Sequence, residues 1–311
     1  MPLAKSLFVD TLKLVKMKRK ALIDEKDSSN WRELKNKLFS GTVVVLATLT
    51  ITPILLIVYQ LLAKGLKQIN FDFFFKVAPD TLQAMTAVRN GEIIPGGIAN
   101  GITGTLLMVV VASLIAIPIS LLIGIFLYEN QGKKYASLIR SLTDILQGVP
   151  SVVLGLIAYI WIVQGVTKGF SALAGSVALA IMMLPLIIRS TEETMKMIPI
   201  SIKEAGAALG VPYHKIILKV MIPSGFSGLM TGILLSISRV LGETAPLMLT
   251  TLGSTTVNFN ITKPTSAVPL QIWEFYNNPN MIDLVWSSSL FLMAFVLTLN
   301  IIAKRISMRF S

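Results

Sequence analysis

Six long apolar stretches constrain the fold of this chain more than any other feature of its sequence. A helix needs roughly 20 predominantly apolar residues to cross a hydrocarbon core of about 30 Å. The stretches that meet this condition lie near residues 42–63, 103–128, 146–166, 170–188, 225–250 and 284–303. We therefore predict an all-α, polytopic membrane protein with six transmembrane helices. The third and fourth stretches are separated only by a short turn around Lys168 and Gly169, so they could instead form a broken or re-entrant pair.

The composition excludes several other classes of protein. Of the 311 residues, 53% are hydrophobic and 14% are charged, against about 25% charged in soluble domains. The chain has no cysteine, which excludes disulfides and thiol chemistry. His214 is the only histidine and has no neighbouring ligands, so no metal site is predicted. The net charge of +12 does not indicate nucleic-acid binding, because the basic residues flank apolar stretches instead of clustering beside aromatic ones.

The distribution of basic residues predicts the orientation in the membrane. Of the 28 Lys and Arg residues, 21 lie in the first 41 residues, the loops 129–145 and 189–224, and the carboxyl end, whereas six lie in the other loops. Cytoplasmic flanks of membrane helices carry the excess of positive charge. We therefore expect a multi-pass protein of the bacterial inner membrane, in contact with lipid, with both termini cytoplasmic. The basic amino-terminal segment is either a solvated flank or a stretch that lies on the anionic leaflet.

The loop 189–224 is predicted to form a helix–turn–helix beneath the membrane. It has helical character near 201–209, followed by the breakers Gly210 and Pro212 and a second apolar and basic stretch. Small residues at 205–208 leave a shallow helical surface, and Glu204 places a charge at its rim. Such a surface suits the docking of another protein.

The same loop resembles the EAA loop of binding-protein-dependent ABC importer permeases. The resemblance rests on Glu204-Ala205-Gly206, on Gly210 six residues after the glutamate, and on Val220-Met221-Ile222-Pro223. Only Gly206, Val220 and Ile222 depart from the family pattern, and the spacing is intact. The resemblance implies the type I (MetI-like) importer fold. It also implies that the loop couples to a separate ATPase through Glu204, Ala205, Gly206, Gly210 and Pro223.

Two ionisable residues fall inside the fifth apolar stretch. A charge at the centre of a bilayer costs about 2.5–3.5 kcal/mol on insertion scales, so Arg239 and Glu243 indicate a functional site. On a continuous helix they would share one face and partly neutralise each other. That face would consist of small and polar residues, namely Gly225, Gly228, Gly232, Ser236, Arg239, Glu243 and Pro246. We expect it to line a translocation path or a subunit interface, with Arg239, Glu243 and Ser236 as pathway residues; the alternative is an ion pair that only fixes helix packing.

Arginine is suited to phosphate because its planar guanidinium presents two parallel donors. The segment 239–247, R-V-L-G-E-T-A-P-L, resembles the R-x-x-G-E-T-A-P-L signature of phosphate-specific permeases. Further matches are Gly96-Gly97-Ile98-Ala99-Asn100 with Gly104-Thr105, Gly148-Val149-Pro150-Ser151, Phe170 to Gly175, and Arg189-Ser190-Thr191-Glu192-Glu193. The resemblance covers about residues 96–305 and identifies the chain as similar to A-type permeases of the phosphate-specific transport (Pst) system. It implies four further components: a homologous PstC-like permease, two PstB-like ATPases, and a PstS-like external phosphate-binding protein.

The sequence contains no G-x-x-x-x-G-K-[ST] phosphate loop, so we expect no cofactor on this chain and ATP use by a partner subunit. An enzymatic activity is not expected. The alternatives are a permease for another oxyanion, an ion-coupled secondary transporter, and a membrane-anchored scaffold. The predicted division is a cytoplasmic basic segment at 1–40, the first transmembrane helix with an outer loop at 41–95, a transport domain at 96–305 with the coupling loop at 201–223, and a cytoplasmic end at 306–311.

Overall fold

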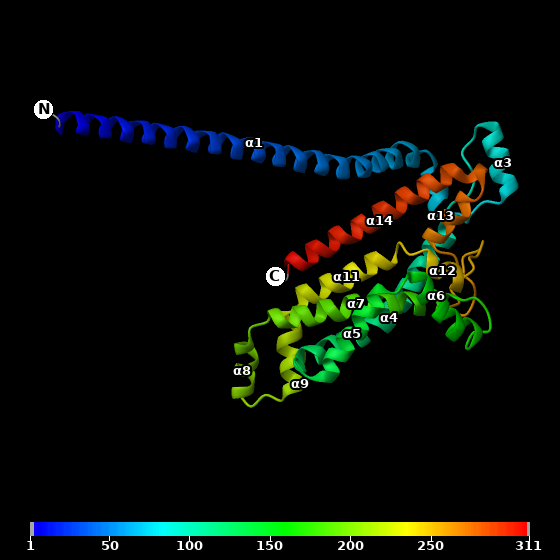
Figure 1. Cartoon of the computed structure of the whole chain (residues 1–311). Helices are drawn as coiled ribbons and strands as arrows, with labels where there is room; N and C mark the ends of the chain where they lie inside the picture. Colours follow the sequence, from blue (N-terminus) through cyan, green and yellow to red (C-terminus); the bar gives the residue numbers. More distant parts are fainter. Residues whose placement is uncertain (1–2, 310–311) are drawn as a thin grey trace. The chain divides into compact units, whose positions relative to one another are not determined.

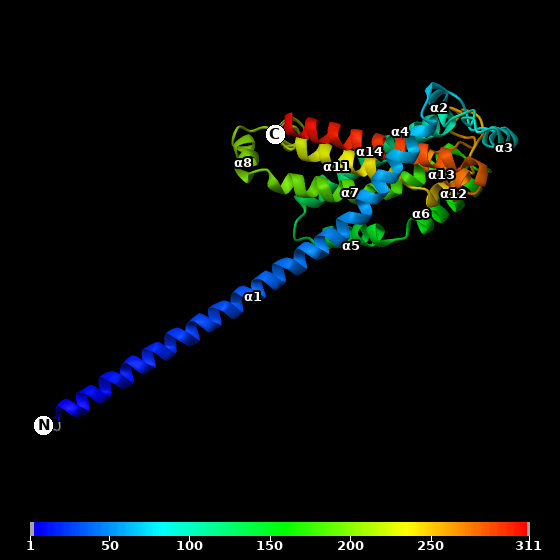
Figure 2. The same cartoon turned by 90° about the horizontal axis from the view of Figure 1, so that it is seen from above.

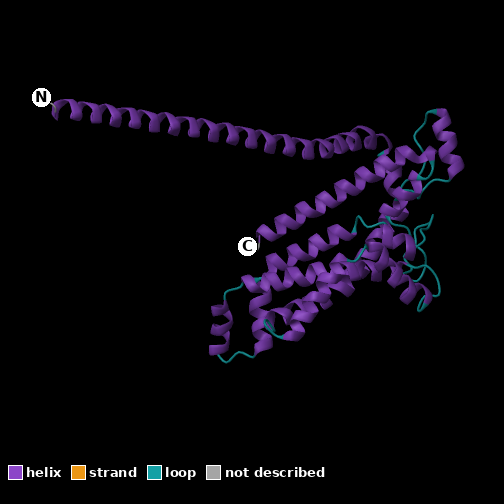
Figure 3. Ribbon diagram, viewed as in Figure 1, coloured by secondary structure: helices purple, strands orange, loops and turns teal. Residues whose placement is uncertain are grey.

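The computed structural model describes residues 3–309, and within this range the chain is helical with no β-strand. The helices are α1 (Leu3–Gly65), α2 (Phe71–Phe75), α3 (Thr81–Asn90), α4 (Ala99–Glu129), α5 (Lys134–Gly148), α6 (Ser151–Ala158), α7 (Ala172–Met197), α8 (Ile200–Ala208), α9 (Tyr213–Ile216), α10 (Ile222–Ser224), α11 (Phe226–Val240), α12 (Ala245–Thr250), α13 (Val268–Tyr276) and α14 (Ile282–Arg309) (Figures 1 and 3). The all-α class predicted from the sequence is confirmed.

The chain divides into an amino-terminal unit that ends at Gln60 and a larger unit that begins at Leu61. Helix α1 forms the described part of the first unit and runs without a break through the predicted span 42–63. Its threonine hydroxyls are satisfied within the helix, since those at positions 42, 48, 50 and 52 each donate to the carbonyl four residues earlier. This local bonding lets hydroxyl groups sit inside an apolar helix.

The six predicted spans correspond to four long helices and two bent pairs of shorter ones. Four helices in the described residues are long and apolar enough to cross a membrane: Trp31–Gln68, Ala99–Glu129, Ala172–Met197 and Pro279–Ile306. The pair Lys134–Gly148 with Ser151–Gln164 bends by 103°, and the pair Tyr213–Ser224 with Phe226–Val240 bends by 72°. The multi-pass architecture is therefore confirmed, with up to six crossings if each bent pair counts as one.

The third predicted span, 146–166, is wrong at its beginning. Helix α5 ends at Gly148 and α6 begins at Ser151, because Pro150 disfavours helical geometry at the residue before it. Helix α5 is amphipathic, with Ala136 and Thr143 buried on one face and Leu138 and Leu142 exposed on the other. Helix α5 is therefore a separate helix, whereas the prediction divided its residues between the loop 129–145 and the start of the span 146–166.

The fifth predicted span, 225–250, is not one helix. Helix α11 ends at Val240, and α12 begins only at Ala245. Pro246 lies in the first turn of α12, where its missing N–H is tolerated, whereas a continuous helix would need that N–H to bond the carbonyl of Gly242. The break at 241–244 separates the two ionisable residues of the predicted site.

The centre of the larger unit is the contact of α4 with α7. A ridge of small residues on α4 is buried at four-residue spacing: Ala112, Ala116, Ser120 and Gly124. A Cβ atom at Gly124 would lie 2.5 Å from the Cβ of Thr191 on α7, so only glycine permits this approach. Helix α11 packs on α7 in the same way, since a Cβ at Gly228 would lie 2.7 Å from the Thr194 Cγ2. Small residues at such contacts are typical of helices that associate within membranes.

The two ends of the larger unit carry different elements. Helix α8 and the carboxyl end of α14 lie at one end, and α3, α12 and α13 lie at the other (Figures 1 and 2). At the latter end the Asn100 amide donates to the Ser254 carbonyl at 2.6 Å and accepts from the Gln271 amide at 2.7 Å. These buried hydrogen bonds tie α4 to the loop after α12 and to α13.

Candidate functional site

A small cavity of about 130 Å³ lies where α5, α6 and α7 meet the end of α11. Its lining consists of Leu146, Gln147, Val149, Ser151, Leu154, Met182, Pro185, Arg239 and Glu243. Met182 and Pro185 lie near the middle of α7, so the cavity is at mid-length of a membrane-spanning helix. The structure thus brings both charges of the predicted pathway to one polar cavity, in which Arg239 is exposed and Glu243 is partly buried.

The geometry of these two charges differs from the prediction. Arg239 lies in the last turn of α11, whereas Glu243 lies in the break that follows, so they do not share a helix face. Within the described residues, the Arg239 guanidinium forms no ion pair and no hydrogen bond, and Glu243 acts on it as a nearby charge. The prediction that they share one face of a continuous helix is therefore wrong, although their opposite charges still act on each other. The guanidinium keeps its donors free for another acceptor.

Two polar residues of the cavity were not identified as site residues from the sequence. Gln147 comes from the end of α5, and Ser151 begins α6 and lines the same cavity as Glu243. Both flank the Gly148-Val149-Pro150 turn, which the sequence analysis had quoted as a family match. The signal was present in the sequence, but its distance from Arg239 along the chain hid the contact.

Ser236, the third predicted pathway residue, lies elsewhere. Its side chain is 1% exposed, its hydroxyl has no hydrogen-bond partner within the described residues, and it is not part of the cavity lining. The small residues on its helix pack on α7: Gly232 faces Ser190, and Gly228 faces Thr194. That part of the predicted small-residue face is thus a helix–helix contact.

The predicted coupling loop forms the helix–turn–helix expected from its sequence. Glu204 and Ala205 lie exposed on α8, and Gly206 is partly buried beneath them. Gly210 has a φ of +70°, a left-handed conformation that glycine adopts without strain, and it turns the chain toward α9. Pro223 is exposed in α10, just before the bend at Gly225.

The loop is fixed to the helices above it by one apolar and one polar contact. A Cβ at Gly206 would lie 3.1 Å from the Ile216 side chain, so α8 and α9 are in close contact at this glycine. Ile216 is 1% exposed and packs in a core with Met195 of α7 and Leu229 of α11. On the other side of α8, the Lys203 ammonium lies 2.8 Å from the Glu129 carboxylate at the end of α4.

The Lys203 ammonium is held in its charged form. Partial burial opposes the charge, but the hydrogen bond and the negative charge of Glu129 outweigh burial and raise the pKa of Lys203 above its ordinary value. The ammonium also lies 4.9 Å from the centre of the Tyr213 ring, on the helix after the turn. A cation over an aromatic face adds to the attraction. Lys203 therefore links both arms of the loop to α4.

Comparison with known proteins identifies a protein family that matches this chain. Residues 116–311 match the family model described as "Binding-protein-dependent transport system inner membrane component". The chain is 34% identical over 276 residues to the phosphate transport system permease protein PstA of Pasteurella multocida, covering 88% of this chain and 94% of that protein. It is also 34% identical to PstA of Yersinia pestis, covering 88% and 90%. A solved structure of the MetNI methionine ABC transporter, in an inward-facing conformation, superposes with a TM-score of 0.58 at 20% identity, covering 68% of this chain and 94% of that chain.

The fold and the family match define a membrane component of a binding-protein-dependent transport system. Such a component is a permease and not an enzyme. Within this class, the chain belongs to the family of phosphate transport system permease proteins PstA. The resemblance noted from residues 96–305 is confirmed.

Proposed function

We propose that this chain is the permease subunit of an ATP-driven phosphate importer and that phosphate passes the cavity beside Arg239. The observation that carries the proposal is an arginine beside the middle of the candidate span Ala172–Met197, whose guanidinium is free of ion pairs within the described residues. Guanidinium groups bind phosphate oxygens through two parallel hydrogen bonds. Phosphate, for which the related PstA proteins are named, fits this chemistry.

Glu243 explains how a strong anion site could still release its ligand. It lines the same cavity, and its charge acts on Arg239 without a direct contact. A carboxylate so placed competes with phosphate for the guanidinium and weakens the bound state. The cavity volume of about 130 Å³ leaves room for a small anion, because one water molecule needs only about 10–15 Å³ of such space.

The remaining components follow from the coupling loop and the family. The chain forms half of the path with a homologous permease, two ATPases bind beneath it at α8, and an external binding protein delivers phosphate. The exposed small residues of α8 support the docking role of Glu204, Ala205, Gly206, Gly210 and Pro223. We assign both termini to the cytoplasm, with residues 1–40 and 306–311 outside the membrane. The first helix and the outer loop then occupy 41–95, and the transport domain occupies 96–305. ATP is used by the ATPases, and this chain binds no cofactor.

Substitution of Arg239 tests the proposal in the assembled complex, reconstituted in proteoliposomes. Arg239→Ala removes a bidentate charge-assisted contact, and we expect uptake of labelled phosphate to fall by about a hundredfold or more while the complex stays assembled. Arg239→Lys keeps the charge but loses the planar fork, so an intermediate loss is expected.

Arg305→Ala is the matched control, because Arg305 is exposed on α14 and is not part of the cavity. Competition by sulfate, tungstate and phosphonate, measured in the same vesicles, distinguishes a phosphate path from a general oxyanion path. Undiminished phosphate uptake by Arg239→Ala would reduce the residue to helix packing.

A further inference from the structure

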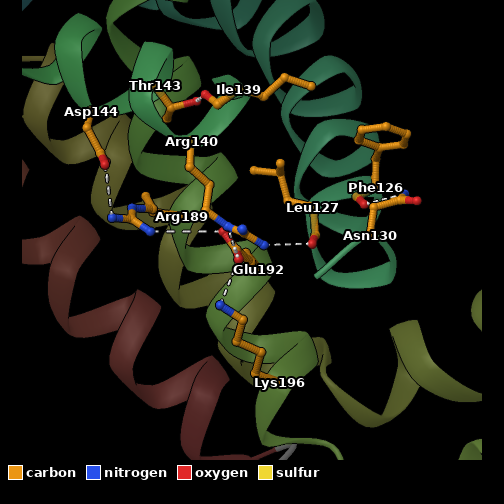
Figure 4. Close-up of polar contacts among 10 residues, drawn as sticks. All are labelled: Phe126, Leu127, Asn130, Ile139, Arg140, Thr143, Asp144, Arg189, Glu192 and Lys196. Atoms are coloured by element: carbon orange, nitrogen blue, oxygen red, sulfur yellow. Dashed lines mark hydrogen bonds and ion pairs between the residues drawn. The ribbon is translucent and has the colours of Figure 1, made fainter. Parts of the chain in front are cut away.

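A cluster of five charged residues joins α5 to α7 at the end of the unit that carries α8 (Figure 4). Its members are Arg140 and Asp144 on α5 and Arg189, Glu192 and Lys196 on α7. We refer to these five residues as the α5–α7 cluster. None of them lines the cavity beside Arg239 or belongs to the coupling loop, so the proposed pathway does not account for them.

Glu192 is the centre of the cluster and is fully buried, with 0% of its side chain exposed. Its Oε1 accepts from Arg140 Nε at 2.8 Å and from Lys196 Nζ at 2.7 Å. Its Oε2 has no hydrogen-bond partner within the described residues. Only one oxygen of this buried carboxylate is satisfied, and the unused acceptor costs free energy.

Arg140 connects a third helix to the cluster. Besides Glu192, its guanidinium donates from Nη2 to the carbonyl of Leu127 on α4 at 2.9 Å (Figure 4). One side chain of α5 therefore contacts both α4 and α7. Because these contacts are charge-assisted and largely buried, they hold α5 in place more firmly than an exposed ion pair could.

The cluster lies directly on one side of the charged cavity. On α5, Asp144 precedes the cavity residue Gln147 by three positions, and on α7, Arg189 follows the cavity residue Pro185 by four. These separations equal about one helical turn, or about 5 Å. The ion pairs of the cluster therefore join α5 to α7 about one helical turn from the cavity, on the side toward α8.

Arg189 has two acceptors within reach. Its Nη2 lies 3.1 Å from Asp144 Oδ1 on α5, and its Nη1 lies 4.0 Å from the unused Glu192 Oε2 on its own helix. If α5 moves away, Arg140 leaves Glu192 and Asp144 leaves Arg189. Arg189 can then complete Glu192 as an i,i+3 pair, while Lys196 remains as an i,i+4 pair.

We propose that the α5–α7 cluster is a latch that positions α5 against α7 on the α8 side of the cavity, and that Arg189 passes from Asp144 to Glu192 when the latch opens. Both arrangements keep the buried Glu192 carboxylate compensated, which gives the helix pair two discrete states and not a continuous range. The inference rests on the proposed transport function for its role in phosphate passage. Arg140, Asp144 and Arg189 are positioning residues, because they act through α5 and do not touch the ion path beside Arg239.

Distance measurements between α5 and α7 test the latch in the assembled complex. The chain has no cysteine, so Ser137→Cys on α5 and Met197→Cys on α7, both exposed, carry spin labels without competing sites. We expect a short-distance and a long-distance population. Arg140→Gln removes contacts that exist only in the closed state, and loss of a charge-assisted contact should raise the ratio of long to short by about tenfold. Asp144→Asn should shift the ratio in the same direction.

Lys134→Gln is the matched control, since it removes a positive charge from an exposed position of the same helix. Arg140→Lys should restore part of the short population, because an ammonium can reach Glu192 but cannot bond Leu127 at the same time. In parallel, Arg140→Gln should lower the phosphate transported per ATP hydrolysed, a ratio that a merely structural residue would not change in correctly assembled complexes.

The proposed latch is refuted if Arg140→Gln and Asp144→Asn give the same α5–α7 distance distribution as Lys134→Gln. Asp144 is half exposed at 49%, so Asp144→Asn keeps the test open even if the Arg140 variant does not assemble. The distance measurement needs no substrate. Failure of the unaltered complex to take up phosphate would therefore refute the proposed function and leave the latch to be decided on its own.

Discussion

Gly155→Ala is expected to lower phosphate transport, because the added methyl group would clash with a neighbouring helix beside the cavity and not with Arg239 or Glu243. Gly155 is on α6, and a Cβ atom there would lie 2.6 Å from the Cα of Pro246 and 3.1 Å from its carbonyl oxygen. Carbon atoms in ordinary contact are about 3.5–4.0 Å apart. Since the nearest atom belongs to the backbone, no side-chain rotation relieves the clash, and α6 and α12 must separate by about 1 Å.

This displacement acts directly on the cavity. Pro246 lies in α12, three residues after Glu243, and Ser151 and Leu154 of α6 line the same cavity. Overpacking of this kind costs about 1–3 kcal/mol, which corresponds to about a 5- to 150-fold loss if the displaced geometry is inactive. We therefore expect phosphate uptake of Gly155→Ala to fall by at least about fivefold at equal amounts of assembled complex.

The assay is uptake of labelled phosphate in proteoliposomes, normalised to the permease found in the complex. Gly148→Ala is the control, because a Cβ at Gly148 meets nothing within 4 Å and the position lies just outside the same cavity wall. Equal uptake by the two variants would show that α6 and α12 can separate freely. The reasoning from close approach to cavity geometry would then be wrong.

Two further predictions concern the coupling loop. Gly210→Val places a β-branched side chain at a φ of +70°, which costs roughly 1–2 kcal/mol, and it should lower the phosphate transported per ATP hydrolysed. Gly210→Asn should retain this ratio, because asparagine tolerates the left-handed conformation. Equal ratios for the two variants would contradict a conformational role for the turn. Because the pKa of Lys203 is raised, its contribution to holding α8 is fully present below the ordinary lysine value and is lost as the pH rises through the raised value. The mobility of a spin label at Leu209→Cys should therefore stay constant from about pH 6 to 9 and increase only above about pH 10.4. With the added substitution Lys203→Met, the same label should be mobile at every pH. A rise in its mobility below about pH 9 without that substitution would contradict the ion pair with Glu129.

The sequence predicted the class of the fold because membrane insertion depends on local composition. Each apolar stretch carries its own signal, and the helices near 42–63, 103–128 and 284–303 were found on this basis. The coupling loop was also predictable, since Gly210 and Pro212 interrupt a helical pattern within a few residues. Both kinds of signal are read over distances shorter than one helix.

The breaks at Pro150 and Pro246 were the main errors in the predicted helices. Hydropathy continues across both prolines, so the average over a window favoured one long span in each case. Proline alone does not decide the outcome, because Pro53, Pro118 and Pro185 lie inside the unbroken helices α1, α4 and α7. Tertiary packing therefore determines which prolines end a helix.

The sequence by itself determined that this chain crosses a membrane repeatedly, that it forms a helix–turn–helix around Gly210, and that Arg239 and Glu243 are unusual charges within an apolar stretch. Only the tertiary structure decided that these two charges meet Gln147 and Ser151 in one cavity, and that Glu192 binds Arg140 from a helix 52 positions earlier. The physical reason is that helix formation and insertion are local, whereas cavities and buried ion pairs depend on which helices approach closely. That approach is set by small residues such as Gly124, Gly155 and Gly228, whose partners no short segment of sequence reveals.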